Sequence, residues 1–470
     1  MSIIIAGLDI GTTKIACFIG QRAEGGKLKI LGHGHTESVG VVRGVVVNIA
    51  DASHSIALAV QQASKMANVA VEEVYVGIAG QHIRSMSHRG NITIAPEHTL
   101  ITQEDVDRLV AEQKHIAMLK PGEQIIHTIP QVYYVDDRQL DTEISPVGVS
   151  GRKLAADFHM VVCNRENMDN IENSVVLAGL KVKRVVLEPI ASSLAVLDET
   201  DKEAGAALVD IGGGTTDLAI FHEGIIRHTS VIALAGNVIT QDISKGCRIM
   251  KDQAELLKVK FGSCMPSLEK ANEHVCIPGL RNQPPREIAT KTLAEIIKAR
   301  LDVILGMVSY EIERAGYDKN LLAGIVLTGG GANMKYIDKM SELVCKNHTR
   351  IGTPDEHLYE GSDETIKDPM FATAIGLVLF GLEQEEKENH TDAEENNDPF
   401  GDDIFKNLID TPITTSSVDE SGSTSNGHPS QSDSKKPSSD DNGSNKGLFN
   451  KLGKKLGKIF IDDINDENRD

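Results

Sequence analysis

Apolar runs and glycine turns alternate in the same way at two places in the chain. Apolar residues flank the turn Asp9-Ile10-Gly11-Thr12-Thr13-Lys14, and others flank Asp210-Ile211-Gly212-Gly213-Gly214-Thr215-Thr216-Asp217. Each pattern predicts a β-hairpin, because two short apolar runs are joined by a tight turn. The tip of such a hairpin exposes backbone N–H groups and threonine hydroxyls that can hold phosphate oxygens. The aspartate that ends each first strand would supply charge for a hydrated Mg²⁺.

The stretch from 83 to 163 has a different pattern from the residues on either side of it. Strands are predicted at 90–94, 124–129, 131–135 and 154–162. One helix begins at an approximate capping box, Thr102 with Asp105, and ends before Pro121. We expect this αβ packet to be an insertion between two halves of one domain.

Helical and strand patterns alternate through the rest of the folded part. Helices are predicted at 51–67, 164–179 and 188–198, within 238–261, at 285–315 and from 368 onward, with strands at 182–187 and 324–328. A third glycine turn, Gly329-Gly330-Gly331, stands between a strand and a predicted helix, where its N–H groups suit a nucleotide's sugar, base or α-phosphate. One such turn alone is more often a plain connection, whereas three in this order favour a nucleotide site. Neither a Walker P-loop nor a GxGxxG dinucleotide fingerprint is present.

Charge is unevenly distributed along the 470 residues. The net charge is −20, and residues 383–445 alone hold 16 acidic and 4 basic side chains. We predict a disordered linker there, with 399–409 as a short helical exception, because apolar residues are too few to offset chain entropy. The acidic body argues against nucleic-acid binding. Six scattered cysteines without a CxxC pair favour a reducing cytosol, and the longest apolar stretch is too short for a membrane span.

Residues 446–461 predict a basic amphipathic helix at the end of this linker. Its apolar residues fall on about one third of a helical wheel and its lysines on the other side; they are Leu448, Phe449, Leu452, Leu456, Ile459 and Phe460, with Lys451, Lys454, Lys455 and Lys458. Such a helix is typical of binding to an anionic membrane surface, although docking into a protein groove is the alternative. Acidic residues in 462–470 follow it and would weaken the anchoring.

The three glycine turns resemble those of the actin/Hsp70/sugar-kinase ATPase superfamily. Within it, the chain resembles the FtsA family of bacterial cell-division proteins over residues 1–382, with further similar stretches at 76–83, 101–106 and 188–193. The packet at 83–163 is similar to subdomain 1C, which FtsA relatives carry on the opposite side from the insertion of actin, MreB and Hsp70. The resemblance implies an α/β, actin-like two-lobe ATPase fold with an FtsA-type 1C insertion, a disordered acidic linker and a C-terminal amphipathic helix.

The resemblance also implies a division into subdomains. The boundaries are 1–82, 164–198 and 361–382 for 1A, 83–163 for 1C, 199–239 and 323–360 for 2A, 240–322 for 2B, 383–445 for the linker, 446–461 for the helix and 462–470 for the acidic tail.

Site residues are implied by position in the same way. Asp9 and Asp210 would hold the hydrated Mg²⁺ of bound ATP; the phosphates would lie on Gly11, Thr12, Thr13, Lys14, Gly212, Gly213, Gly214 and Thr215, and the adenosine on Gly329, Gly330 and Gly331. Glu255 and Lys258 are ribose candidates, with an exposed ion pair as the equally weighted alternative. Glu188 would orient the attacking water, the alternative being a first-turn helix carboxylate. Ala235 replaces a glycine that relatives usually have and could crowd its turn.

The leading functional hypothesis is an ATP-binding adaptor with slow or no turnover. The resemblance implies that it polymerises, tethers FtsZ through 2B to the cytoplasmic face of the inner membrane at mid-cell, and recruits later divisome proteins through 1C. A pilus-assembly adaptor of the PilM type and a small-molecule kinase of the same superfamily are the alternatives. Neither alternative explains the linker and the basic helix.

Overall fold

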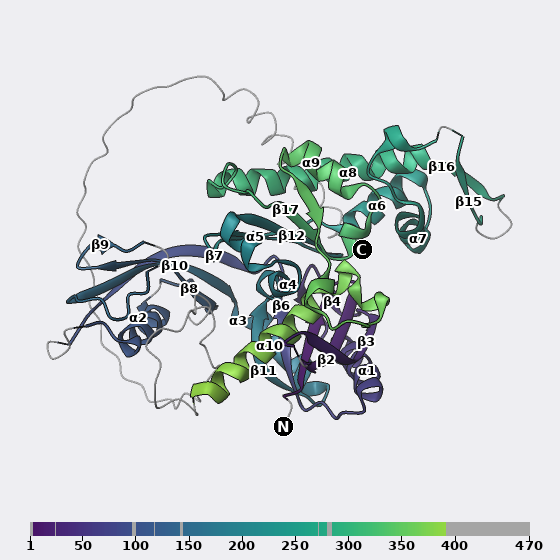
Figure 1. The fold of residues 1–470 in the computed structure, drawn as a ribbon. Helices are drawn as coiled ribbons and strands as arrows, with labels where there is room; N and C mark the ends of the chain where they lie inside the picture. Colours follow the sequence, from purple (N-terminus) through teal and green to yellow (C-terminus); the bar gives the residue numbers. More distant parts are fainter. Residues whose placement is uncertain are drawn as a thin grey trace, which may run out of the picture. The chain divides into compact units, whose positions relative to one another are not determined.

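The first lobe is built on a mixed five-stranded sheet (Figure 1). The computed structural model describes residues 3–23, 25–95, 100–116, 118–141, 144–270, 272–279 and 284–391. The strand order is β11 (Lys181–Leu187), β6 (Glu73–Ile78), β1 (Ile5–Ile10), β2 (Lys14–Arg22) and β3 (Leu28–Glu37). β11, β6 and β1 are parallel, and β1, β2 and β3 are antiparallel. Helix α1 (Ile49–Ala67) packs on β2 and β3, and α3 (Arg165–Leu177) packs on α1 and β11.

The second lobe repeats this sheet strand for strand. Its order is β14 (Ile225–Ile232), β13 (Thr216–His222), β12 (Ala206–Ile211), β17 (Gly324–Thr328) and β18 (Thr349–Ile351). β14, β13 and β12 are antiparallel, as β3, β2 and β1 are, and β12, β17 and β18 are parallel, as β1, β6 and β11 are. The helices of this lobe are α5 (Glu199–Ala204), α6 (Gly236–Cys247), α7 (Lys251–Phe261), α8 (Thr290–Ala315) and α9 (Ile337–Cys345). The doubled topology agrees with the actin-like two-lobe fold that the family resemblance implied.

The packet at 83–163 forms a separate antiparallel sheet. Its order is β7 (Arg84–Thr93), β10 (Lys153–Asn164), β8 (Glu123–Val135) and β9 (Arg138–Gln139). Helix α2 (Gln103–Ile116) covers it and begins at the predicted capping box: the Asp105 amide donates to Thr102 Oγ1 at 3.3 Å and the Thr102 amide to Asp105 Oδ2 at 3.1 Å. Leu109, Phe158 and Met160 are buried in its own small core. The packet therefore has the αβ composition expected from its sequence.

The remaining elements are short. They are α4 (Glu188–Val196), the strand pairs β4 (Val41–Val42) with β5 (Val45–Val46) and β15 (His274–Ile277) with β16 (Arg286–Ala289), and the 3₁₀ turns Pro266–Leu268, Gly330–Asn333, Pro354–His357, Glu364–Lys367 and Pro369–Phe371.

Three predicted elements differ from the structure. The strands expected on either side of Pro130 are one strand, because a register shift between Asp157 and Phe158 accommodates the proline. The third glycine turn leads into a 3₁₀ turn, not an α-helix, because Gly329 adopts a φ of 81° that starts a tighter bend. The helix expected from Pro285 begins at Thr290, since Arg286–Ala289 pairs with β15.

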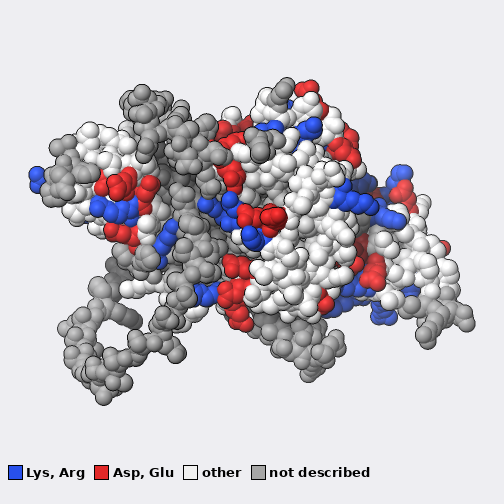
Figure 2. Space-filling model, turned by 90° about the horizontal axis from the view of Figure 1, so that it is seen from below, with Lys and Arg blue, Asp and Glu red and all other residues white. Residues whose placement is uncertain are grey.

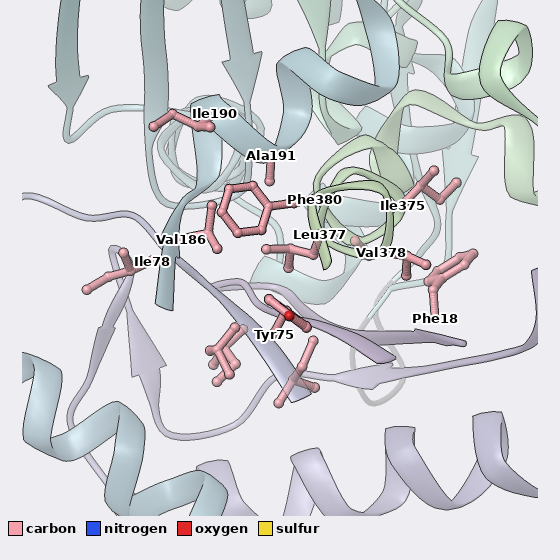
Figure 3. Close-up of a cluster of buried hydrophobic side chains, with 14 of the residues drawn as sticks. Phe18, Tyr75, Ile78, Val186, Ile190, Ala191, Ile375, Leu377, Val378 and Phe380 are labelled. Carbon is pink, nitrogen blue, oxygen red and sulfur yellow. The ribbon is translucent and has the colours of Figure 1, made fainter. Parts of the chain in front are cut away.

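Helix α10 (Ala372–Thr391) packs against the first-lobe sheet and against α4. Leu377, Val378 and Phe380 lie among side chains of β2, β6 and β11 in the buried cluster of Figure 3, and the Phe380 ring is 6.0 Å from that of Tyr75. α10 crosses α4 so closely that a Cβ on Gly376 would lie 1.8 Å from the Ala191 carbonyl oxygen. This close crossing fixes α10 against α4.

The helix α10 continues past Leu382, where the linker was predicted to start. Gln384 accepts a hydrogen bond from Arg184 at 2.9 Å, Glu385 from Tyr75 at 3.2 Å, and Glu386 from Arg22 at 3.1 Å. These polar residues read as linker by composition, but strands β2, β6 and β11 supply a partner for each. The other linker residues from 392, the 399–409 segment and the predicted membrane helix lie outside the described residues.

The surface carries mixed charge. On the face shown in Figure 2, basic and acidic side chains of the described residues lie in small neighbouring groups. Ion pairs among the described residues include Arg84 with Glu123 at 2.6 Å and Arg300 with Asp242 at 2.6 Å.

Candidate functional site

The two glycine turns close in the same way. The Gly11 amide donates to the Lys14 carbonyl at 3.0 Å, and the Gly212 amide donates to the Thr215 carbonyl at 2.9 Å. The last paired residues are Ile10 with Ile15 in one hairpin and Ile211 with Thr216 in the other. Each strand pair therefore ends in a four-residue turn with its amide groups at the tip.

The tips of these two hairpins touch each other. A Cβ built on Gly213 would lie 1.8 Å from Thr13 Oγ1, and one built on Gly214 would lie 2.4 Å from Thr12 Oγ1. Thr12 Oγ1 also accepts a hydrogen bond from the Gly44 amide at 2.9 Å. Glycine at 213 and 214 allows this close approach, because a side chain there would have to displace Thr13 or Thr12 or move the tips apart.

One cavity of about 670 Å³ lies where the tips meet. That volume is in the usual range for a small-molecule or cofactor site. Every site residue predicted within the folded part lines it: Asp9, Gly11, Thr12, Thr13, Lys14, Glu188, Asp210, Gly212, Gly213, Gly214, Thr215, Glu255, Lys258, Gly329, Gly330 and Gly331. Residues from both lobes, more than three hundred positions apart, are thus brought to one place.

Four carboxylates crowd the inner wall of the cavity. Burial raises the pKa of Asp9 to about 6, with Lys14 lowering it and Asp210 raising it. Burial and the Asp210 carboxylate raise the pKa of Asp217 to about 7. Burial, followed by repulsion from Asp9, Asp217 and Asp210, raises the pKa of Glu188 well above its usual range. The cluster is therefore short of positive charge.

Asp210 has hydrogen-bond donors from two different helices. Ser192 Oγ on α4 donates to Asp210 Oδ2 at 3.0 Å, and Thr373 Oγ1 on α10 donates to the same oxygen at 3.2 Å. Burial raises the pKa of Asp210, and these two hydrogen bonds lower it. They hold the carboxylate in one orientation.

Lys14 is the cation nearest to Asp9. Its Nζ lies 3.7 Å from Asp9 Oδ2, donates to the Met370 carbonyl and stands 4.5 Å from the centre of the Phe371 ring. The carbonyl and the aromatic face hold the ammonium at the start of α10. From there it can neutralise charge in the cavity next to the first hairpin.

The third glycine turn has packing reasons for two of its glycines. Gly329 has a φ of 81°, and a Cβ on it would lie 2.2 Å from Asp210 Oδ1. A Cβ on Gly331 would lie 2.5 Å from Ile211 Cγ2. Gly330 has open space in front of it, with Met370 Cβ the nearest atom at 3.9 Å. Of the three, Gly330 leaves the most room for a ligand.

Glu255 and Lys258 form an ion pair and line the cavity as well. Lys258 Nζ lies 2.8 Å from Glu255 Oε2 and donates to the Gly236 carbonyl at 3.0 Å and to Thr240 Oγ1 at 2.9 Å. The lysine ammonium is mostly buried, at 11% exposure, whereas Glu255 is 38% exposed. The pair is therefore an i,i+3 ion pair with a mostly buried lysine and a more exposed glutamate, and both residues line the cavity.

The alanine at 235 does not disturb its turn. Its φ of −158° is extended backbone, which any residue adopts, and its methyl group is fully buried. The Gly236 amide still donates to the Gly212 carbonyl at 3.1 Å and the Asn237 amide to the Gly213 carbonyl at 2.8 Å. These two bonds hold the turn against the tip of the second hairpin.

Sequence reasoning missed several residues of the site. Asp217 was seen only as part of a repeated motif, and Ser192, Thr373 and Gly44 were not singled out. Asp217 carried a usable signal, because it ends the second glycine motif as Lys14 ends the first. Ser192 and Thr373 carried none, since their role depends on two helices meeting beside Asp210.

The residues present suit a hydrated divalent cation. Asp217 Oδ1 is buried without a hydrogen-bond partner, and the carboxylates around it repel one another. Within the described ranges, no three His, Cys, Asp or Glu side chains are placed to ligate a metal directly. An ion held through its water shell is consistent with both observations.

The predicted membrane-binding residues 448–460 lie outside the described residues. Among the helices of the described ranges, none has both the length and the apolar composition to cross a membrane.

Models of known families match three parts of the chain. The model "Cell division protein FtsA" matches residues 207–376, the "SHS2 domain inserted in FTSA" matches 80–162, and the "Hsp70 protein" model matches 164–231. The second match covers almost the whole of the αβ packet. The third covers β11, α4 and the second hairpin.

Individual proteins are similar over most of the chain. The cell division protein FtsA of Pseudomonas aeruginosa is 37% identical over 383 residues, 81% of this chain and 90% of the relative. That of Neisseria meningitidis is 38% identical over 375 residues, 80% of this chain and 89% of the relative. A solved PilM–PilN type IV pilus biogenesis complex aligns with a TM-score of 0.58 and 15% identity over 80% of this chain and 98% of that one, which shows the fold alone.

The two-lobe fold, the αβ insertion and the doubled hairpins agree with these similarities. Identity above 30% over about nine tenths of each relative's length places the chain in one family. The chain belongs to the FtsA family of cell division proteins.

Proposed function

We propose that the cavity binds ATP with a hydrated Mg²⁺ and that nucleotide binding sets the state of a cell-division adaptor. The observation that supports this most directly is the contact between the hairpin tips, where Gly213 and Gly214 meet Thr12 and Thr13. Two rows of backbone amides face one cavity from opposite lobes, so a polyphosphate could be held by both at once. A ligand held in this way would also fix the lobes relative to each other.

The proposed roles of the residues follow from their surroundings. The amides of 11–14 and 212–215 would bind phosphate oxygens, and Lys14 would neutralise part of their charge. Asp9 and Asp210 would accept hydrogen bonds from the waters of Mg²⁺, which would supply the positive charge that the four carboxylates lack. Glu255 and Lys258 would face the ribose, and the adenosine would lie against 329–331, chiefly at the open Gly330.

Glu188 is proposed to orient the attacking water in any hydrolysis. Gly77 makes room for it, since a Cβ there would lie 3.0 Å from Glu188 Cγ. Burial and the neighbouring carboxylates raise the pKa of Glu188, and a cation in the cavity would offset the repulsion from these neighbours. We therefore expect slow turnover that depends on Mg²⁺, carried mostly by electrostatic positioning.

The partners follow from membership of the FtsA family. We propose that the protein self-associates, binds FtsZ through residues of 240–322 and recruits later division proteins through 83–163. The linker 383–445 and the helix 446–461 would tether it to the cytoplasmic face of the inner membrane at mid-cell. The subdomain boundaries predicted above remain part of this proposal.

Co-sedimentation tests the tethering and the nucleotide site together. Full-length protein is mixed with anionic liposomes and FtsZ, with and without MgATP, beside a 1–445 truncation and the Glu188→Ala variant. We expect full-length protein to carry FtsZ into the liposome pellet and the truncation to leave it in solution. A truncation that pellets as well as the full chain contradicts the membrane role of 446–461.

Steady-state ATP hydrolysis is measured on the same lipid samples. Rapid hydrolysis that is lost in Glu188→Ala contradicts the slow-turnover proposal.

A further inference from the structure

The αβ insertion contacts both lobes, although it is inserted in the first lobe only. β7, β8 and β10 pack against β14, the edge strand of the second-lobe sheet. Ser85 Oγ donates to the Thr229 carbonyl at 2.9 Å, and Gln131 Nε2 donates to the Ile226 carbonyl at 2.8 Å. In return, Arg227 Nη1 donates to the Gln131 carbonyl at 3.0 Å.

The centre of this contact is buried. His159 of β10 and Thr229 of β14 are 5% and 7% exposed, and His159 Nε2 lies 2.9 Å from Thr229 Oγ1. Burial lowers the pKa of His159 to about 4, so the ring is neutral at physiological pH. A neutral ring and a hydroxyl in a dry interface depend on each other for hydrogen bonding, because no water replaces a lost partner.

The second-lobe side of the contact leads directly to the phosphate hairpin. Thr229 is the cross-strand partner of Ala219, and Val231 is the partner of Asp217. Asp217 lines the cavity and accepts a hydrogen bond from Thr215 Oγ1 at 2.8 Å. One strand pairing therefore separates Thr229 from the hairpin that would hold phosphate.

The first-lobe side of the insertion lies just as close to the cavity. His127 Nε2, on β8, accepts a hydrogen bond from the Leu187 amide at 3.1 Å. Leu187 directly precedes Glu188, which lines the cavity. The insertion is thus bonded to both lobes near the cavity: His127 to Leu187, which precedes Glu188, and His159 to Thr229, on the strand that pairs with the second hairpin.

We propose that the insertion responds to the separation of the two lobes through His127 and His159. Its mobility would therefore change when nucleotide closes the cavity. This inference rests on the proposed nucleotide binding. A rigid packet bonded to two bodies at two points must move or loosen when those bodies move, because packed contacts break more readily than they stretch. By linkage, whatever loosens the insertion must also change nucleotide affinity.

Hydrogen exchange measured by mass spectrometry tests this in the full-length protein. Exchange of β7 and β10 is followed with and without saturating MgATP in the wild type. The Ser85→Ala/Thr229→Val variant removes the two side-chain bonds made at Thr229 and leaves those of Gln131 and Arg227 in place. Ser87→Ala/Thr229→Ser is its control, since Ser87 is an exposed β7 position and serine keeps the hydroxyl. Nucleotide binding is titrated in the same samples, and exchange of the buried β12 amides reports whether each variant is folded.

We expect MgATP to change wild-type exchange in β7 and β10 by about fivefold or more, the lower end of ordinary allosteric coupling. The Val variant is expected to lose this response while β12 stays protected, and the control to keep it. An undiminished response in the Val variant overturns the inference. So does a wild type that binds MgATP without any change in the insertion, in which case the proposed function stands. A wild type that binds no nucleotide overturns both.

Discussion

The turn between β1 and β2 and the turn between β12 and β13 have the same backbone but different charges around them. In the first, Lys14 follows the threonines and lies 3.7 Å from Asp9. In the second, Thr215 holds the position of Lys14, and Asp217, the cross-strand partner of Asp210, has its pKa raised to about 7 by burial and by Asp210. The first hairpin includes a cation, Lys14, whereas the second includes an additional carboxylate, Asp217. Duplication of a fold therefore does not imply duplication of its chemistry.

The largest change in nucleotide affinity is expected when a side chain is added at the point where the two hairpin tips touch. In Gly213→Val the new Cβ would fall 1.8 Å from Thr13 Oγ1, so the tips must separate. We expect nucleotide affinity, measured by calorimetric titration, to fall by about a hundredfold, since overpacking costs up to about 3 kcal/mol. Adding Thr13→Gly should recover much of it. Gly306→Ala, on α8 with open space around it, serves as the control. Full affinity in Gly213→Val would show that the tips need not meet.

Charge removal should act in opposite directions on the two hairpins. Lys14→Met takes away a cation beside the phosphates and should weaken ATP binding by about tenfold, near the value of one charged hydrogen bond. Asp217→Asn takes away a repelling carboxylate, so in EDTA it should strengthen ATP binding. Titrations with and without Mg²⁺ measure both effects. A loss of affinity in EDTA for both variants contradicts the assignment of different charges to the two hairpins.

Stability of the metal-free protein should depend on pH through Asp217. The unfolded chain ionises this group near 3.8 and the folded chain at about 7, so folding keeps a proton that the unfolded state releases. The free energy of unfolding should therefore fall between about pH 4 and pH 7, by on the order of 4 kcal/mol, and level off above.

Urea unfolding of the wild type and Asp217→Asn in EDTA measures this pH dependence. The two should be closest near pH 4, and the variant should be the more stable one at pH 8. Parallel curves over the whole range would mean that Asp217 does not titrate as its burial implies.

The smallest effects should come from the hydroxyls at the two tips. Thr12→Val loses the bond from the Gly44 amide, and Thr215→Val loses the bond to Asp217. Each should cost about 1 kcal/mol of unfolding free energy at pH 8, the net value of an ordinary hydrogen bond. At pH 5 the Thr215→Val cost should shrink, because Asp217 is then protonated, whereas the Thr12→Val cost should not change. If the cost in unfolding free energy changes with pH in the same way for both variants, the two hairpins do not differ in charge as described.

Residues with local signals were predictable from the sequence. The glycine turns, the Thr102–Asp105 capping box and the αβ packet all have short-range patterns, and the structure contains each of them. The resemblance of the three turns to a superfamily supplied the pairing of the lobes, which no periodicity specifies. Positions such as Gly330 and Lys258 could be assigned to one wall of a cavity only because that family arrangement was known.

Features that depend on distant partners were not predictable. Gln384 and Glu386 look like linker residues until Arg184 and Arg22 are placed beside them. Pro130 looks like a strand break, but β8 bulges at the neighbouring Gln131 where it pairs with β10, and the strand continues through the proline. The contact of His159 with Thr229 joins residues 70 positions apart from two separate sheets. In each case the decisive neighbour is set by the tertiary fold.

The polar end of α10 has a mechanical consequence. Residues 384–386 are bonded to β11, β6 and β2, three strands of one sheet, through Arg184, Tyr75 and Arg22. A pull on the chain beyond Thr391 is therefore shared by several strands in parallel and does not peel one bond after another. If the tail is anchored while a filament pulls on the folded part, the force enters the first lobe through the bonds of residues 384–386. Helix α10 would transmit this force to Thr373, which donates a hydrogen bond to Asp210. Tension and nucleotide would then meet at the same carboxylate.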